Sequence, residues 1–418
     1  MKTALKLDVY EAKNASLNSY SGRVCMFVLN TLRMDARVMR AASALSQAGF
    51  AVCVVDVVDK CSQSTEDIHG ISVKHVKVAS AFIATNFKLW AILKALLLFI
   101  RSTLHVLRTP ADFYHAHDAT ALPTCYIAAR LRGKPLIFDA HELPLSELDG
   151  SRRRWLRILL TPLLSHMLSS CAGGIGAAPF YEQNLRECYH IARVSLIRNV
   201  PPYRFVPKND LLRQHLNLRS DTRIALYQGY LQYGRGLDKL VQAAAFLDPN
   251  IVIVMMGKGK GAGDASSQLR DLIAREKLDD RVKIIPHVQY EELLDWIVSA
   301  DIGLITYQPD YSLNFQMCLP NKLFEFLMAG LPVLTSSLDA VIDVFKTHNI
   351  GQILPSLASE AIGAAINTML ADSAALASMH RNALDAAQNE FNWEKEKPKL
   401  IRLYNEIQND RQSSERRR

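Results

Sequence analysis

This 418-residue chain lacks paired cysteines, long apolar runs and a signal-like amino terminus, and each absence excludes a class of protein. Its 7 cysteines are scattered and none forms a C-x2-C pair, which argues against a zinc site or a disulfide framework and favours a reducing compartment. The opening residues, MKTALKLDVYEAKN, contain no apolar stretch of the kind that a secretory signal carries. We therefore expect a cytoplasmic location.

Two signatures of nucleotide and nucleic-acid binding are also missing. The loop GKGKGAG (257–263) lacks the G-K-[ST] ending of a P-loop, so we interpret it as a flexible loop. The strand patterns of the basic half show no aromatic residues interleaved with basic ones, as a binder of single-stranded nucleic acid would have. We expect no P-loop ATPase activity and no nucleic-acid partner.

Positive charge is concentrated in the first half of the chain. Residues 1–200 hold 24 Lys and Arg against 15 Asp and Glu, so essentially all of the net charge of +8 lies there. Two oily stretches of this half, 87–108 and 151–170, combine basic residues with Trp and Leu, which is typical of helices in a membrane interface. Neither has the roughly 20 apolar residues that cross a bilayer. We expect peripheral binding to the inner face of an anionic membrane; the alternative is that both are core helices.

Apolar strand patterns alternate with helical patterns along the chain, which indicates α/β domains whose parallel sheets are covered on both faces. A helix is predicted over 34–50. The first series of predicted strands comprises 23–30, 51–58, 112–116, 135–140 and 173–177. The second series comprises 223–229, 250–257, 281–286, 301–307 and 331–336.

The two series predict two Rossmann-like, doubly wound domains, over 1–200 and 201–390, joined by the proline-rich stretch 196–210. Ligands of such sheets bind at the carboxyl ends of the strands, so we expect the site in a central cleft between the facing domains. From residue 391 the chain is predicted to form a last helix that crosses back to the N-terminal domain, followed by a basic tail.

The stretch LPNKLFEFLMAGLPVL (319–334) places charges at the start of an otherwise apolar helix. Pro320 suits the first helical position, and the amides from Asn321 to Leu323 would then point out of the helix end. With the helix dipole they would form an anion site, to which Lys322 adds a full charge. Glu325 lies on the same face, where a carboxylate could accept hydrogen bonds from a ribose. The pattern predicts a nucleotide; the alternative is a helix end with a solvated ion pair.

A second candidate phosphate site follows the strand that ends at Gly229. In LYQGYLQYGRGLDKL (226–240), Arg235 lies between two glycines at the start of the next helix. Glycine lets the backbone approach a ligand closely, and arginine binds phosphate with two parallel hydrogen bonds. The alternative is an exposed arginine in a flexible loop. The residues predicted to bind phosphate here are Gly229, Arg235, Gly236 and, at the end of the neighbouring strand, Gly257.

The first half offers the strand FYHAHDATALP (113–123), in which alternate residues face the same side. His115 and His117 therefore leave open a zinc site, together with His141 or Glu142 of FDAHE. A plain structural histidine is a further alternative. We favour a histidine that faces the ligand cleft and expect no bound metal. Other residues that follow strand ends could line the same wall or simply cap helices and form salt bridges: Asp35, Arg37, His141 and Glu142.

These motifs, taken together, resemble the family 4 glycosyltransferases of GT-B fold. The resemblance rests on the order strand–G-x5-[KR]-G–helix, strand–G-x-G and P-N-K-L-F-E-x3-A-G-x-P-V. It extends from D-x-R-V-x-R (35–40) to F-x-W-E (391–394). It implies that the C-terminal domain binds a nucleotide-sugar donor, while the N-terminal domain binds the acceptor.

The resemblance also implies roles for single residues. Glu325 matches the glutamate that holds the donor ribose, and Arg235 matches the basic residue at the diphosphate. His117 matches a histidine near the reacting sugar. The loop that receives the base contains His287 and Val288, and the acceptor side contains Asp35, Arg37, His141 and Glu142.

Two positions depart from the family pattern. Met317 replaces a glutamate that usually lies near the sugar ring, and Tyr230 replaces an arginine that often follows the first glycine. Phosphate binding then depends on Arg235, Lys322 and the amides of the helix end, including that of Asn321.

The activity implied is a retaining, metal-independent transfer without a further cofactor. The expected acceptor is a glycan or lipid-linked glycan at the cytoplasmic membrane face, as in bacterial surface polysaccharide assembly. A sugar-nucleotide epimerase of the same fold is one rival, although it needs carboxylates around the sugar. A catalytically inactive GT-B subunit of an assembly complex is the other.

Overall fold

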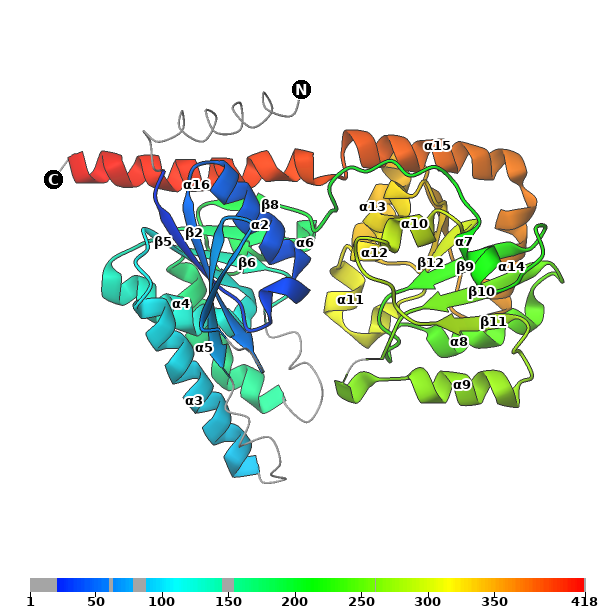
Figure 1. The fold of residues 1–418 in the computed structure, drawn as a ribbon, viewed down its shortest axis with the longest axis horizontal. Coiled ribbons are helices and arrows are strands. Elements are labelled where there is room, and N and C mark those ends of the chain that lie inside the picture. The colour runs from blue at the N-terminus through cyan, green and yellow to red at the C-terminus, as the bar shows by residue number, and fades with distance from the viewer. Residues whose placement is uncertain (1–20, 60–62, 78–87, 145–153, 260, 417–418) are drawn as a thin grey trace. The chain divides into compact units, whose positions relative to one another are not determined.

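A computed structural model describes residues 21–59, 63–77, 88–144, 154–259 and 261–416, apart from the side chains of residues 88–91, 154–156, 262, 414 and 415. The chain divides into two compact units. Unit 1 comprises Met1–Ile197 and Lys397–Arg418, and unit 2 comprises Arg198–Glu396. In each unit, helices flank a sheet of mostly parallel strands (Figure 1).

The sheet of unit 1 has 8 strands in the described residues, in the order β3-β4-β2-β1-β5-β6-β7-β8. All neighbours pair in parallel except β3 and β4, which form an antiparallel hairpin at one edge. The inner strands are apolar runs because both of their faces are covered. The strands are β1 (Arg23–Phe27), β2 (Ala51–Val58), β3 (Thr65–Ile68), β4 (Ile71–Lys77), β5 (Phe113–His117), β6 (Leu136–Ala140), β7 (Gly173–Gly176) and β8 (Val194–Leu196).

Helices pack on this sheet around a core that includes the fully buried rings of Phe27, Tyr114 and Phe138. The last helix, α16, begins in unit 2 and continues into unit 1, where Tyr404 packs against Phe50 and Phe113. The helices are η1 (Leu32–Met34), α2 (Ala36–Gln47), α3 (Lys88–Leu107), α4 (Asp118–Arg132), α5 (Arg154–Ser169), α6 (Pro179–Glu187) and α16 (Trp393–Arg416).

Among the described residues of unit 2, the sheet has 6 parallel strands in the order β11-β10-β9-β12-β13-β14. The strands are β9 (Arg223–Gln228), β10 (Ile251–Met256), β11 (Val282–Ile285), β12 (Ile302–Ile305), β13 (Val333–Thr335) and β14 (Gly351–Ile353). The helices around it are α7 (Leu211–His215), α8 (Leu237–Ala243), η4 (Ala244–Phe246), η5 (Gly261–Gly263), α9 (Ser266–Arg275), α10 (Leu293–Ile297), η6 (Pro309–Tyr311), α11 (Leu313–Met317), α12 (Asn321–Met328), α13 (Asp339–His348), α14 (Ser359–Ala371) and α15 (Ser373–Asn389).

The strand order of each sheet fixes where a ligand can bind. In unit 1, β2 lies on one side of β1 and β5 lies on the other, so the strand order reverses at β1. In unit 2, β10 lies on one side of β9 and β12 lies on the other, so the order reverses at β9. The crevice at such a switch point, outside the carboxyl ends of the strands, is the usual ligand site of a doubly wound sheet. Each unit therefore carries one such crevice.

Several predicted boundaries differ from those observed. The helix predicted over 34–50 is α2, Ala36–Gln47, because Asp35 caps its first turn through a bond from the Val38 amide. The strand predicted over 23–30 ends at Phe27. No helix in the described part of the chain is long and apolar enough to cross a membrane.

Candidate functional site

In unit 2, the crevice between β9 and β12 is lined by the start of α12. Pro320 precedes the helix as its N-cap rather than occupying the first helical position, and it provides no side-chain cap. The prediction of three outward amides is wrong for Leu323, whose N–H donates to the Pro320 carbonyl at 2.9 Å. The side chain of Asn321 accepts a hydrogen bond from Asn199 at 2.9 Å.

Lys322 is buried at this helix start, with 4% of its surface exposed. Its Nζ lies 3.5 Å from the ring centre of Tyr227 and 5.1 Å from that of Tyr307. Within the described residues, this atom has no hydrogen-bond partner. A cation over an aromatic ring gains about 0.5–2 kcal/mol, whereas removing an ion from water costs several kcal/mol, so the rings do not compensate for burial. Burial, and then the charge of Arg235, hold the pKa of the Lys322 amine well below its usual value.

Arg235 approaches the same point from the loop before α8. Its guanidinium lies 4.9 Å from the ring centre of Tyr307, and Nη1 donates to the Tyr307 hydroxyl at 2.8 Å. A Cβ on Gly229 would lie 3.7 Å from Lys322 Nζ and 3.9 Å from Arg235 Nη1. The backbone of Gly229 is therefore next to both cations, and an anion at this glycine would meet both.

Two further predicted glycines hold this loop close to the sheet. A Cβ on Gly257 would lie 1.8 Å from the carbonyl oxygen of Gly229. Gly236 has a φ of +65°, and a Cβ there would lie 2.2 Å from the carbonyl oxygen of Thr306. Neither position can hold a side chain without moving backbone, which explains why glycine occurs at both.

Glu325 lies one turn behind Lys322 on α12 and accepts a hydrogen bond from Gln228 Nε2 at the end of β9. It also lines a cavity of about 400 Å³. The other lining residues include Pro202, Tyr290, Leu294, Ile297 and Met328. His287 and Val288 do not line this cavity; His287 Nε2 lies 3.0 Å from Lys258 Nζ. The carboxylate thus has an apolar recess beside it that is large enough for a planar base.

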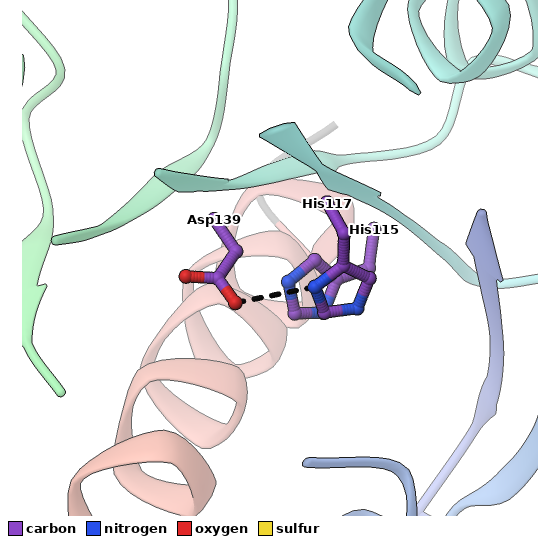
Figure 2. Close-up of side chains that lie close together, drawn as sticks. All are labelled: His115, His117 and Asp139. Atoms are coloured by element: carbon purple, nitrogen blue, oxygen red, sulfur yellow. Dashed lines mark hydrogen bonds and ion pairs between the residues drawn. The ribbon is translucent and has the colours of Figure 1, made fainter. Parts of the chain in front are cut away.

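The crevice of unit 1 contains a buried network centred on Asp139, at the end of β6. Arg37 donates to its two carboxylate oxygens at 2.9 and 2.6 Å, and a third bond joins Arg37 to the Ile197 carbonyl. His117 Nδ1 lies 3.2 Å from Asp139 Oδ2, as Figure 2 shows, and His141 Nε2 lies at the same distance. Burial opposes ionisation of Asp139, but Arg37 and then His141 hold its pKa well below the usual value.

His141 is the most accessible imidazole of this network, with 18% of its side chain exposed. Its Nδ1 lies 3.3 Å from Asp118, whose other oxygen accepts the His141 amide. Burial lowers the pKa of His141, but the carboxylates of Asp118 and Asp139 raise it to about 9. His141 therefore carries a proton and a positive charge at neutral pH.

His117 itself is buried, and its Nε2 has no hydrogen-bond partner among the described residues. The ring of His115 stacks on it at 4.2 Å, and His115 Nδ1 is bonded to the Tyr404 hydroxyl at 2.8 Å. Burial, and then His117, hold the pKa of His115 well below its usual value. His117 Nδ1 lies 3.2 Å from Asp139 Oδ2 and 3.3 Å from His141 Nε2, so Nε2 is the ring nitrogen that is left for a ligand.

The group His115, His117 and Asp139 has the composition of a metal site, and its ligand atoms lie within 4.8 Å of one another (Figure 2). The two rings are stacked at 23°, so their lone pairs run side by side instead of converging on one point. Asp139 is already bonded to a permanent cation, Arg37. These features disfavour a metal ion, and we continue to expect none.

The remaining predicted residues of unit 1 are dispersed. Asp35 is used as the N-cap of α2, and Glu142 is exposed in the loop after β6. Sequence reasoning missed Tyr227, Tyr307, Gln228 and Tyr290, which surround the predicted residues of unit 2. The only signal for the two buried tyrosines was their place at the ends of β9 and β12.

Comparison with known proteins adds two kinds of similarity. Residues 34–200 match the family described as Glycosyltransferase Family 4, and residues 208–386 match the family described as Glycosyl transferases group 1. A D-inositol 3-phosphate glycosyltransferase of Xylanimonas cellulosilytica is 26% identical over 193 residues, which are 46% of this chain and 44% of that protein. The protein of the same name from Thermobispora bispora is 26% identical over 72% of this chain and 73% of its own length.

Solved structures share the fold. Sucrose-phosphate synthase from Thermosynechococcus elongatus superimposes with a TM-score of 0.75 at 18% identity, covering 92% of this chain and 98% of that one. Anabaena HepE, solved with UDP-glucose, gives 0.67 at 16% identity over 94% and 100%. WaaG, a glycosyltransferase involved in lipopolysaccharide biosynthesis, gives 0.66 at 15% identity over 91% and 99%.

Proposed function

We propose that this chain, which belongs to the family 4 glycosyltransferases and has the GT-B fold, transfers a sugar to a glycan or lipid-linked acceptor in surface polysaccharide synthesis. Membership makes it a retaining glycosyltransferase that uses a nucleotide-sugar donor. The observation that carries the proposal is the pair of basic side chains at Gly229, where Lys322 and Arg235 approach one backbone position.

The donor diphosphate would bind over Gly229, between Arg235 and Lys322 and against the first amides of α12. Negative charge that develops on this diphosphate as the sugar leaves would be stabilised by hydrogen-bond donors that are already in place. Such preorganised stabilisation is the largest single contribution to the rate enhancement of many enzymes. Glu325 would accept the ribose hydroxyls, and the cavity beside it would hold the base. No step requires a metal ion.

On the unit 1 side, we assign the sugar contact to His117 through its Nε2 atom and place His141, Arg37, Asp35 and Glu142 toward the acceptor substrate. His117 is buried in this structure, so that contact requires a local rearrangement. His141 already reaches the surface as a cation and could donate a hydrogen bond to the acceptor.

The donor is the first thing to test. HepE was solved in complex with UDP-glucose, so we propose a UDP-sugar; the sugar itself is left open because Met317 replaces a glutamate. A thermal-shift screen of UDP-, GDP-, ADP- and TDP-sugars should give one base that raises Tm as its concentration increases. Absence of any shift would contradict the donor site. Release of a nucleoside diphosphate only when an acceptor is present would distinguish sugar transfer from epimerisation. Donor binding without turnover would favour a catalytically inactive subunit.

The acceptor is proposed to be lipid-linked because unit 1 exposes an apolar helix face. Large apolar side chains are exposed at successive turns of α3, and α5 exposes a second set of large apolar side chains. These residues are Ile92, Leu93, Leu96, Leu97, Ile100 and Leu104 on α3, and Ile158, Leu159 and Leu163 on α5. Contiguous exposed apolar surface marks an interaction site, and the excess of basic residues in this half favours an anionic membrane, at its inner face.

Flotation with vesicles tests this placement. Wild type should bind phosphatidylglycerol vesicles in low salt and neutral vesicles weakly, and Leu96→Ser with Ile100→Ser should reduce that binding. Leu131→Ser is the matched control, because Leu131 is an exposed leucine of α4 outside this face. Equal flotation of the wild type, the α3 double variant and the Leu131→Ser control would rule out the α3 face as the membrane-binding surface. The arginines 152–154, whose side chains lie outside the described residues, are expected to contribute about 1 kcal/mol each.

A further inference from the structure

The amine of Lys322 is buried among groups from several elements, and burial together with the charge of Arg235 disfavours its protonated form. Tyr227 from β9 and Tyr307 from the segment after β12 present ring faces. Arg235 adds a second positive charge, whereas Glu325 and Cys318 are the groups whose negative charge would favour the ammonium. Glu325 is itself engaged by Gln228.

An ammonium group has three N–H donors, and in water all three are hydrogen-bonded. At Lys322 the described residues supply no acceptor to Nζ, and the side chain is buried. A neutral amine is much less penalised by such a site than an ammonium, since burial acts on the charged form. The position beside Gly229, shared with Arg235, is therefore unfavourable for two cations until an anion lies there.

We propose that Lys322 is a neutral amine before the donor binds, and that the arriving diphosphate causes it to take up one proton from solvent. The inference rests on the proposed function, because it assigns the diphosphate to this site. The proton comes from water or buffer and bonds to the Nζ lone pair, which yields the ammonium that pairs with the diphosphate. Donor binding is then linked to proton uptake, and Lys322 presents its full charge only when the donor is bound.

This linkage has a thermodynamic signature. Over the pH range in which free Lys322 is neutral and donor-bound Lys322 is charged, donor affinity falls about tenfold for each unit of pH. A lysine that stays protonated in both states gives no such dependence. His287 and Lys258 lie 3.0 Å apart outside the cavity beside Glu325, and a variant of His287 tests whether this pair contributes to the proton count.

Calorimetry measures the proton directly. UDP-glucose is titrated into the full chain near pH 8 in two buffers of different ionisation enthalpy, and the difference in binding heat gives the protons taken up. UDP-glucose is the probe because its diphosphate has no proton to exchange at this pH. We expect about one proton per donor in wild type and in His287→Gln. We expect none in Lys322→Arg, whose guanidinium is always charged, or in Lys322→Met.

The outcomes separate this inference from the proposed function. If neither UDP-glucose nor another nucleotide-sugar binds the wild type, the proposed function fails. If UDP-glucose binds wild type without proton uptake, the donor site stands and the inference is overturned. Uptake that disappears in His287→Gln also overturns it. Lys346→Met, at an exposed lysine of α13 paired with Asp343, is the matched control and should retain the full proton count.

Discussion

The ion pair between Arg37 and Asp139 allows a quantitative test of the unit 1 network. Both side chains are almost fully buried, at 6% and 2% exposure, and two hydrogen bonds join them. Replacing Asp139 by Asn keeps the shape and removes the charge. Breaking a buried pair by removing one partner costs about 3–5 kcal/mol, because the remaining ion is buried without compensation. We expect Asp139→Asn to lower the free energy of unfolding of unit 1 by that amount.

A double-mutant cycle separates the pair from the side chains around it. Arg37→Met combined with Asp139→Asn removes both charges, so we expect the double variant to be more stable than Asp139→Asn alone. Asp221→Asn is the control, because Asp221 pairs with Arg219 on the surface and should change stability by less than about 1 kcal/mol. Urea unfolding with hydrogen exchange of the β6 amides reports on unit 1. A loss no larger in Asp139→Asn than in the control would refute the reasoning.

Three further predictions concern single side chains. Glu325→Ala should weaken UDP-glucose binding by roughly 10- to 150-fold at unchanged Tm, because a hydrogen bond to a charged group contributes about 1.5–3 kcal/mol; unchanged affinity by calorimetry would contradict the ribose assignment. Arg235→Ala should lower kcat/KM while EDTA leaves the wild-type rate unchanged, and activity that EDTA abolishes and manganese restores would show that a metal is needed. The folded pKa of His141 lies above its ordinary value, at about 9, so its stabilisation is complete at pH values below the unfolded pKa and is lost as pH rises through about 9. The unfolding free energy of unit 1 should therefore fall between about pH 7 and 10 in wild type and vary less in His141→Gln, and parallel curves for the two proteins would exclude the assignment.

The fold was predictable where strands are buried on both faces. The run of β10 is apolar throughout and that of β2 is apolar except for Asp56, so their type and place follow from composition. The β3–β4 hairpin was missed because β3, the edge strand, has Ile68 as its one apolar residue, and because polar residues interrupt the apolar ones of β4. His69 and Gly70, the two residues between the strands, both have positive φ, and Gly70 was the part of this turn that the sequence could indicate.

For the candidate site, the sequence could predict which loops contribute residues but not how the side chains contact one another. Residues at the carboxyl ends of parallel strands must meet, so Arg235 and Glu325 could be assigned to one region from their positions in the chain. Burial of the Lys322 amine could not be predicted, because it depends on Tyr227 and Tyr307, which are far apart in sequence. In the same way, nothing near His115 indicates that Tyr404, 289 residues later, supplies its hydrogen bond.

The crevices of the two units differ in how their buried charges are balanced. In unit 1 the guanidinium of Arg37 meets the carboxylate of Asp139, so the buried charges compensate each other within the protein. In unit 2, Arg235 and Lys322 both approach Gly229, and Glu325 lies a turn behind them. Two basic groups directed at one point in a low-dielectric site are unfavourable unless an anion joins them. The diphosphate of the proposed donor would supply that anion, which is why we place the donor at the basic groups of unit 2 rather than at those of unit 1.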